Sequence, residues 1–219
     1  MEHRQHLART VRPLLLCGAA ASLVYVSSDV VGALNYPGYD YASQAISEMS
    51  AIGAPTTELL APFYTAFSVL FAAFAAGVWL AAGGRRSLRW SAGLLIAVAA
   101  LGIVWAFFPM SMRGAGRTTT DTMHLVLSGL TMSLLAGAAA TGAAAFGRTF
   151  RIYSAATVLV MIAFFGLTML DARHIDTGAT PYMGINERVS MAAWLLWIAV
   201  FSIALYRVEP ARSPTPSLA

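Results

Sequence analysis

The chain has 219 residues, of which 58% are hydrophobic and only 11% are charged, and its formal net charge is +4. A soluble globular chain carries about 25% charged residues, so this composition excludes a soluble enzyme and an intrinsically disordered chain. The basic residues are all arginines that flank long apolar runs and form no single basic face, so no nucleic-acid partner is expected.

Apolar runs of about 20 residues, the length that a helix needs to cross the hydrocarbon core, recur along the whole chain. Among open chains only helices satisfy their backbone groups there, so the sequence predicts an all-α polytopic membrane protein. One six-helix transmembrane domain, 13–207, is expected between a cytoplasmic N-terminal arm, 1–12, and a disordered cytoplasmic tail, 208–219. The six predicted spans are 13–34, 57–82, 90–108, 121–146, 153–171 and 188–206.

The charges divide unevenly between the two sides of the predicted bundle. Ten arginines fall beside the termini and the short connections after the second and fourth spans, whereas four fall on the other side. The positive-inside rule therefore predicts a protein of the bacterial cytoplasmic (inner) membrane with both termini in the cytoplasm. Eight of the ten acidic residues fall on the outer side, together with His124 and His174. Binding or chemistry is therefore expected at the outer side.

The first span carries a polar face in its outer half. Ser22, Tyr25 and Asp29 follow one another at spacings of three and four, with Ser28 beside them. A carboxylate inside a span is costly and normally faces a protein interior or a wet cavity. Asp29 is therefore either a structural carboxylate bonded to a neighbouring helix or part of a ligand-binding or catalytic site.

The loop after the first span is predicted to form a short amphipathic helix in the outer interface. Ile46 and Met49 belong to its apolar side, and Ser47 and Glu48 belong to its polar side. A proline–glycine pair before this helix and a further glycine and proline after it favour turns at both ends. The helix is interpreted either as a lid over a cavity between the spans or as an interfacial anchor.

The fourth span carries a second polar face that consists of Asp121, His124 and Ser128. Asp121 is placed either to cap this helix, whose N-terminus attracts negative charge, or to face the predicted cavity. His124 lies one turn deeper and is either a hydrogen-bonded interior histidine or a functional group.

A stripe of small residues runs along the same span at every fourth position and includes Gly129, Ser133 and Gly137. Small residues at this spacing let another helix backbone approach closely. The stripe predicts helix packing, either inside the bundle or against a second copy of the chain or a membrane partner protein.

The last outer loop and its flanks bring further polar residues to the outer side. Asp171 and His174 precede the loop tip, and Glu187 and Arg188 open the sixth span. Adjacent residues on a helix point in different directions, so Glu187 and Arg188 are expected to have separate partners.

Several short motifs lie along the chain: Pro37-Gly38-Tyr39, Ser43-Gln44, Ile46-Ser47-Glu48, Gly53-Ala54-Pro55, Phe108-Pro109-Met110, His124, and Gly184 with Glu187-Arg188. Through these motifs the chain resembles the bacterial membrane family called domain of unknown function 998. The resemblance covers nearly the whole chain and implies the topology and candidate positions but no activity. Members of that family often carry an acidic residue after Phe-Pro-Met, where this chain has Ser111.

Three functions are consistent with these features. The first is binding or transport of a lipid or small amphiphile in an outward-facing polar cavity, with membrane lipids as partners. The second is an intramembrane hydrolase or transferase that acts on a lipid at the outer leaflet, with Ser28 or Ser47 as nucleophile and His124 as base. The third is an accessory subunit of a membrane complex.

The sequence leaves open whether the protein is an enzyme, and it identifies no cofactor. No local motif has metal-ligand spacing, so no metal site is predicted, with His124 and His174 as weak candidates only. A haem carrier is not expected because axial ligation needs paired intramembrane histidines.

Overall fold

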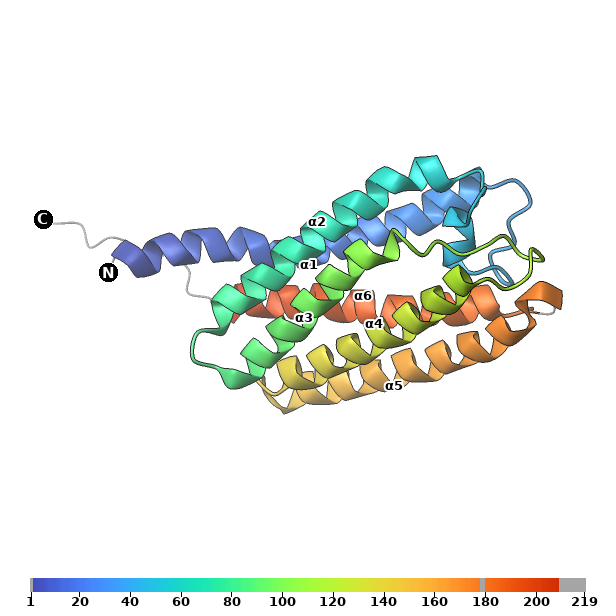
Figure 1. The fold of residues 1–219 in the computed structure, drawn as a ribbon. Helices are drawn as coiled ribbons and strands as arrows, with labels where there is room; N and C mark the ends of the chain where they lie inside the picture. The colour runs from blue at the N-terminus through green and yellow to red at the C-terminus, as the bar shows by residue number, and fades with distance from the viewer. Residues whose placement is uncertain (1, 178–179, 209–219) are drawn as a thin grey trace, which may run out of the picture.

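Six long helices make up most of the computed structural model, which describes residues 2–177 and 180–208 (Figure 1). Within that part of the chain, six helices are long and apolar enough to cross a membrane. The protein is therefore an all-α, multispanning membrane protein, as the sequence predicts. The helices are α1 (Glu2–Asn35), α2 (Thr57–Ala82), α3 (Arg86–Trp105), α4 (Thr119–Ala143), α5 (Arg148–Asp171) and α6 (Met183–Val208), with the 3-10 helices η1 (Ile46–Ser50) and η2 (Ala172–Thr177).

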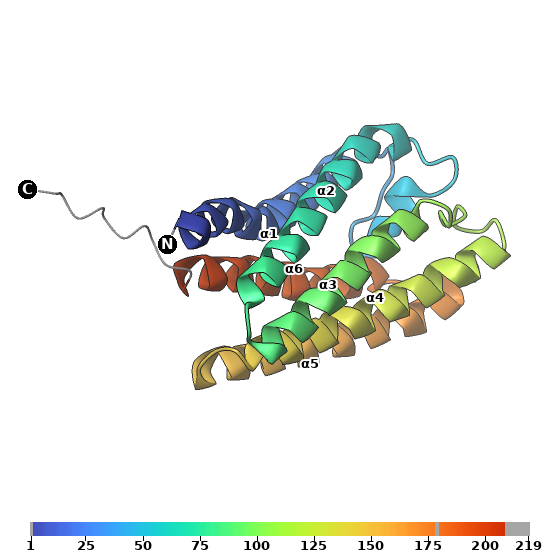
Figure 2. The same cartoon turned by 60° about the vertical axis from the view of Figure 1, so that its left-hand side comes forward.

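The six helices pack as a closed ring. Each helix lies against the next in chain order, and α6 returns to pack against α1 as well as α5 (Figures 1 and 2). Of the six spans, α6 is the most buried, because 44% of the residues in its most apolar 18-residue stretch lie inside the bundle. The centre of the ring is filled by large side chains from several helices, including Phe71, Phe74, Leu95, Trp197 and Phe201.

The two ends of the bundle differ in their connections. The start of α1, the end of α6 and the short turns that follow α2 and α4 lie at one end, which we call the terminal end (Figure 1). Three longer connections, with the described residues 36–56, 106–118, and 172–177 with 180–182, lie at the opposite end, which we call the loop end. All the polar residues singled out in the sequence as candidates for binding or catalysis belong to the loop end or to the adjacent helix turns.

The helix limits differ by at most five residues from the predicted spans, except at the start of α1, which lies eleven residues earlier. The helix α1 already begins at Glu2, so the predicted N-terminal arm continues the first helix. The helix α4 begins at Thr119 because Thr118 and Asp121 form a reciprocal capping box there. The predicted disordered tail lies, beyond Val208, outside the described residues.

The connection between α1 and α2 contains a helix, but it is the five-residue 3-10 helix η1, which is shorter than the amphipathic helix that the sequence predicts. It packs into the end of the bundle, because Ile46 and Met49 are buried against Leu60 of α2. Gly32 of α1 allows this contact, since a Cβ atom at that position would lie 2.8 Å from the sulfur of Met49. The apolar side of η1 therefore packs on the end of the bundle.

The small-residue stripe of α4 approaches another helix closely at one of the three positions named from the sequence. A Cβ atom at Gly129 would meet no other atom within 4 Å, and Ser133 is exposed. Gly137 lies near α3, with its Cβ position 3.2 Å from Leu94. A closer approach is at Gly142, beside Ser91 and Phe201. Packing of the stripe, inside the bundle or against a partner, stays a prediction.

Candidate functional site

An ion pair between Asp29 and Arg188 joins the first and last helices at the loop end. The Nη2 atom of Arg188 lies 2.9 Å from Oδ1 of Asp29, and both side chains are close to 10% exposed. The Nε atom of Arg188 donates a second bond to the same carboxylate, and the hydroxyl of Tyr41 donates a third. The buried carboxylate of Asp29 is thus bonded to a neighbouring helix, which is the structural alternative raised from the sequence.

Arg188 also holds the 36–56 connection in place. Its Nη1 donates to the backbone carbonyls of Tyr41 and Gln44 at 2.9 and 3.2 Å, and its Nη2 donates to the hydroxyl of Tyr39 at 2.8 Å. The guanidinium group also stacks on the Tyr41 ring, 3.5 Å from its centroid. Gly184 permits this approach, because a Cβ atom there would clash with the Tyr41 and Gln44 carbonyl oxygens.

A second ion pair, between Glu48 and Arg113, joins the first and second long connections. Arg113 donates to both Glu48 oxygens, from Nη2 at 2.7 Å and from Nε at 3.0 Å. The same guanidinium group reaches the hydroxyl of Thr180 at 2.6 Å and the carbonyl of Ser43 at 3.0 Å. All three long connections therefore meet at Arg113. The hydrogen bond to Glu48 raises the pKa of Arg113, which keeps its charge fixed.

Arg113 and Tyr41 were not among the residues singled out in the sequence, and Tyr39 was named there only as part of a family motif. Arg113 had a weak signal, since it is one of only four arginines expected on the acidic outer side. Burial raises the pKa of Tyr39, while its hydrogen bond from Arg188 acts in the opposite direction, so Tyr39 stays a neutral donor and acceptor. The hydroxyl of Tyr39 donates to the carbonyl of Ala45 at 2.8 Å.

Asp121 serves as a cap and an anchor for the 106–118 connection. Its carboxylate accepts bonds from the backbone N–H and hydroxyl of Thr118, both at 2.7 Å. It also accepts bonds from the backbone N–H and hydroxyl of Ser111, at 2.6 and 3.0 Å. These four bonds correspond to the capping alternative for Asp121.

His124 is held between α3 and α4. Its Nδ1 lies 3.0 Å from the carbonyl oxygen of Phe108, and its ring meets the edge of Trp105 with centroids 4.4 Å apart. Among the described hydrogen bonds, that of the His124 ring is to Phe108, and those of the Asp29 carboxylate are to Arg188 and Tyr41.

The candidate hydroxyl groups bond to their own helices or lie apart from His124. Ser28 donates to the carbonyl of Tyr25, and Ser128 donates to the carbonyl of His124. Ser47 is half-buried on η1. No described hydrogen bond connects any of these hydroxyls to the His124 ring, so the predicted nucleophile and base are not in contact.

The remaining candidates lie at the α5–α6 connection. Asp171 accepts a bond from the Asn186 side chain at 3.1 Å, and the exposed His174 lies on η2. In the part of the chain that the structure describes, no three His, Cys, Asp or Glu side chains gather closely enough to hold a metal ion.

Glu187, like Asp171, accepts a single described hydrogen bond. Its Oε2 accepts the backbone N–H of Ile46 at 2.6 Å, and its neighbour Arg188 points to Asp29, so the two have separate partners as predicted. Among the described ion pairs none involves Glu187. The carboxylate interacts electrostatically with the hydroxyl groups of Tyr25 and Tyr64.

An aromatic layer lies beneath these charged groups. Tyr25 of α1 contacts Tyr64 and Phe67 of α2 and Trp194 of α6, with ring centroids 6.3, 5.2 and 6.1 Å apart. The Trp194 indole donates to the sulfur of Met191. The charged network at the loop end therefore rests on a layer of rings from three helices.

Residues 19–204 match the family model described as "Protein of unknown function (DUF998)". The chain belongs to this family. No curated protein and no solved structure matched it. In this DUF998 protein, the motif residues of the first loop and of the start of α6 are the ones that contact each other, through Arg188 and Glu187.

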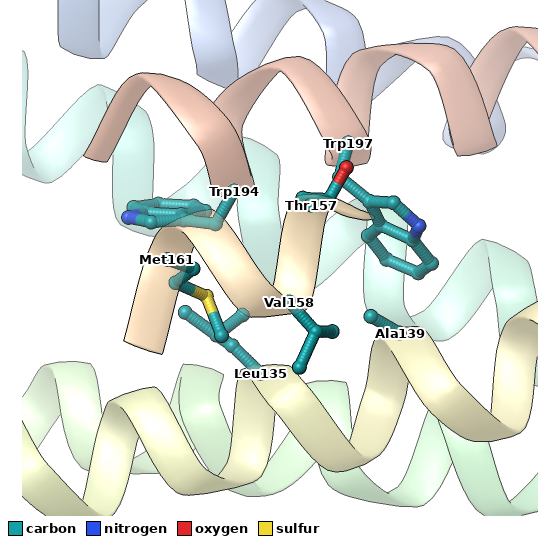
Figure 3. Close-up of a pocket in the computed structure, with 7 residues that line it drawn as sticks. All are labelled: Leu135, Ala139, Thr157, Val158, Met161, Trp194 and Trp197. Atoms are coloured by element: carbon teal, nitrogen blue, oxygen red, sulfur yellow. The ribbon is translucent and has the colours of Figure 1, made fainter. Parts of the chain in front are cut away.

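This DUF998 protein also has a small apolar hollow in the middle of the bundle, between α4, α5 and α6 (Figure 3). It contains none of the polar candidates, so it is separate from the charged network. Trp194 lines this hollow and also contacts Tyr25, so it lies between the hollow and the aromatic layer under the charged network. The lining residues are Leu135, Ala139, Thr157, Val158, Met161, Trp194 and Trp197.

Proposed function

We propose that this protein binds or transports a lipid or small amphiphile through a polar cavity at the loop end of the bundle. The observation that carries this proposal is Glu187, a carboxylate near membrane depth that lacks an ion pair among the described residues and whose side chain keeps partial accessibility. Ionisable groups inside membrane proteins normally mark binding sites or ion paths unless they are paired.

In this proposal the loop end faces the outside of a bacterial cytoplasmic membrane. The support is the distribution of arginine, which is concentrated beside the termini and short turns. A ligand would then enter from the outer leaflet, between the polar network and the aromatic layer. Amphipathic ligands suit such a boundary, because one end meets polar groups and the other meets rings.

The bonding of Ser28 and His124 supports binding over hydrolysis. Ser28 donates to a carbonyl of its own helix, no described bond joins Ser47 to His124, and the His124 ring lies against Phe108 and Trp105. A hydrolase of the serine type needs a hydroxyl within hydrogen-bond reach of its base.

Native mass spectrometry of the full chain, purified in a neutral sugar detergent, tests this proposal. We expect the wild-type protein to retain an amphiphile from the membrane. Met191→Trp should lose it, because the larger ring would fill the space beside Glu187 and Tyr25. Leu196→Trp is the matched control, since Leu196 is 58% exposed on the same helix and faces outward.

A bare mass for the wild-type protein, or equal retention by Met191→Trp and Leu196→Trp, would reject the proposal. Thermal melting of both variants confirms that each one is folded, so that a lost ligand reports on the site. A bare wild-type protein that co-purifies with a second membrane protein would point to the accessory role.

A further inference from the structure

The buried charges at the loop end do not balance. Asp29 pairs with Arg188 and Glu48 pairs with Arg113, at 2.9 and 2.7 Å. Glu187 adds a third carboxylate next to these two pairs, and it interacts electrostatically with both Glu48 and Asp29. When all five groups are ionised, one negative charge remains, and it resides on Glu187. A positive ligand would neutralise it.

The second oxygen of Glu187 is available to such a ligand. Only one oxygen, Oε2, accepts a described hydrogen bond, from Ile46. In the described part of the chain, the polar side-chain atoms sealed from solvent without a partner are those of Thr131 and Tyr153. Glu187 is half-buried at the start of α6. Its Oε1 atom is therefore neither sealed from solvent nor hydrogen-bonded among the described residues.

Aromatic side chains also lie near Glu187. Glu187, Met191 and Trp194 follow one another at spacings of four and three on α6 and so share one helical face. Tyr25 and Tyr64 approach from α1 and α2, and both rings are only half-buried. The faces of tyrosine and tryptophan rings attract organic cations, and such rings together with a carboxylate are suited to ammonium groups.

The arginines do not offer an alternative site for an anion. Every nitrogen of the Arg188 guanidinium group already donates to Asp29, Tyr39 or a backbone carbonyl. The nitrogens of Arg113 are likewise bonded to Glu48, Thr180 and Ser43. A phosphate or sulfate group would have to break these bonds, whereas a cation would leave them intact.

We propose that Glu187 binds the ammonium group of a cationic amphiphile, with the rings of Tyr25 and Tyr64 beside that group and the apolar tail along the aromatic layer. This inference rests on the proposed function and names its ligand class. The ammonium group could belong to a membrane lipid or amphiphile, or to a small water-soluble cation. Because the site lies beside apolar rings inside the bundle, a tail should strengthen binding.

Native mass spectrometry of the full chain with three probes tests this inference. The probes are dodecyltrimethylammonium, dodecyl sulfate and tetramethylammonium. We expect the wild-type protein to bind the first at least about tenfold more tightly than the other two, since it combines the charge with the tail. Glu187→Gln should remove this preference, because the amide keeps the shape and the acceptor for Ile46 but loses the charge.

The matched control is Glu58→Gln, which makes the same chemical change at an exposed position of α2 and should bind all three probes like the wild type. If Glu187→Gln does not fold, Tyr64→Leu replaces it and should weaken binding of dodecyltrimethylammonium while dodecyl sulfate binding stays unchanged. Equal affinities for the cationic and anionic amphiphiles, or a Glu187→Gln variant with the wild-type preference, would overturn the ammonium assignment. Binding of none of the amphiphiles would instead overturn the proposed function.

Discussion

At the loop end, two buried arginines bridge helices and connections, whereas at the terminal end aromatic rings pack and short turns join neighbouring helices. Trp197 stacks on Phe201 with centroids 4.5 Å apart, and Phe150 lies 6.1 Å from Phe201. The polar contacts between helices there include single bonds from serine to a carbonyl, such as Ser202 to Leu15 and Ser91 to Ala138, and the bond from the Trp197 indole to Ser154.

This contrast separates the requirements of folding from those of function. Among the described residues, the terminal end is closed by apolar packing, short turns and isolated polar bonds, without a buried ion pair. Buried charge is costly, and replacing buried ion pairs by apolar residues is often neutral or stabilising. The charges at the loop end therefore need a reason beyond stability, and a site for a ligand supplies one.

The largest effect is expected from Arg188→Ala, which removes the shared partner of Asp29 and the first loop. It leaves a buried carboxylate without its counter-charge, so the free energy of unfolding should fall by about 3–5 kcal/mol. Thermal or denaturant unfolding in detergent measures this change. Arg89→Ala, at an exposed arginine of the terminal end, is the control and should change stability by less than about 0.5 kcal/mol. Equal losses of unfolding free energy in the two variants would contradict the view that arginines hold the loop end together but not the terminal end.

A somewhat smaller loss is expected from Glu48→Gln. The amide still accepts the backbone N–H of Ala45, but the charged bonds to Arg113 are lost, at a cost of about 1.5–3 kcal/mol. The Arg113 side chain is 21% exposed, so water partly replaces its partner and limits the loss. Unfolding measurements beside Glu58→Gln check this value, and a Glu48→Gln variant as stable as Glu58→Gln would show that the second ion pair contributes nothing.

Gly184→Ala tests the close approach of α6 to the first loop. The added methyl group would clash with two backbone carbonyl oxygens, and we expect a loss of about 1–3 kcal/mol. Gly129→Ala makes the same change where no atom lies within 4 Å, and it should be neutral or stabilise the helix by up to about 1 kcal/mol. Equal changes of melting temperature in the two variants would mean that the first loop does not pack closely against Gly184.

The smallest effect is expected from Ser202→Ala at the terminal end. Hydrogen bonds between transmembrane helices contribute on average about 0.6 kcal/mol, so losing the bond to Leu15 should barely lower stability. The same unfolding assay measures it. A loss as large as that of Arg188→Ala would show that polar bonds, too, hold the terminal end together.

The spans could be predicted from the sequence to within a few residues, because length and hydropathy are local properties of the chain. The same is true of the cap at Asp121, whose main partner Thr118 is three residues away. The separate partners of Glu187 and Arg188 also followed from local helix geometry alone.

The network at the loop end could not be predicted, because its partners are far apart in the chain. Asp29 and Arg188 are separated by 159 positions, and Glu48 and Arg113 are separated by 65. Periodicity placed Asp29 on a polar face but could not name its partner. The loop helix differs from the prediction for the same reason, since the contacts of Met49 with Gly32 and Leu60 pull it into the bundle.

The Asp29–Arg188 pair also sets an order for assembly in the cell. The partners lie 159 residues apart, so α1 is synthesised long before its counter-charge exists. At about 5–20 residues per second, the ribosome needs roughly 8–32 s to reach Arg188 after Asp29. During that time the α1 carboxylate has no arginine partner, and the ring stays open until α6 arrives. A chain that stops before α6 would keep an unpaired acid in the membrane, a feature by which quality control could tell incomplete chains from finished ones.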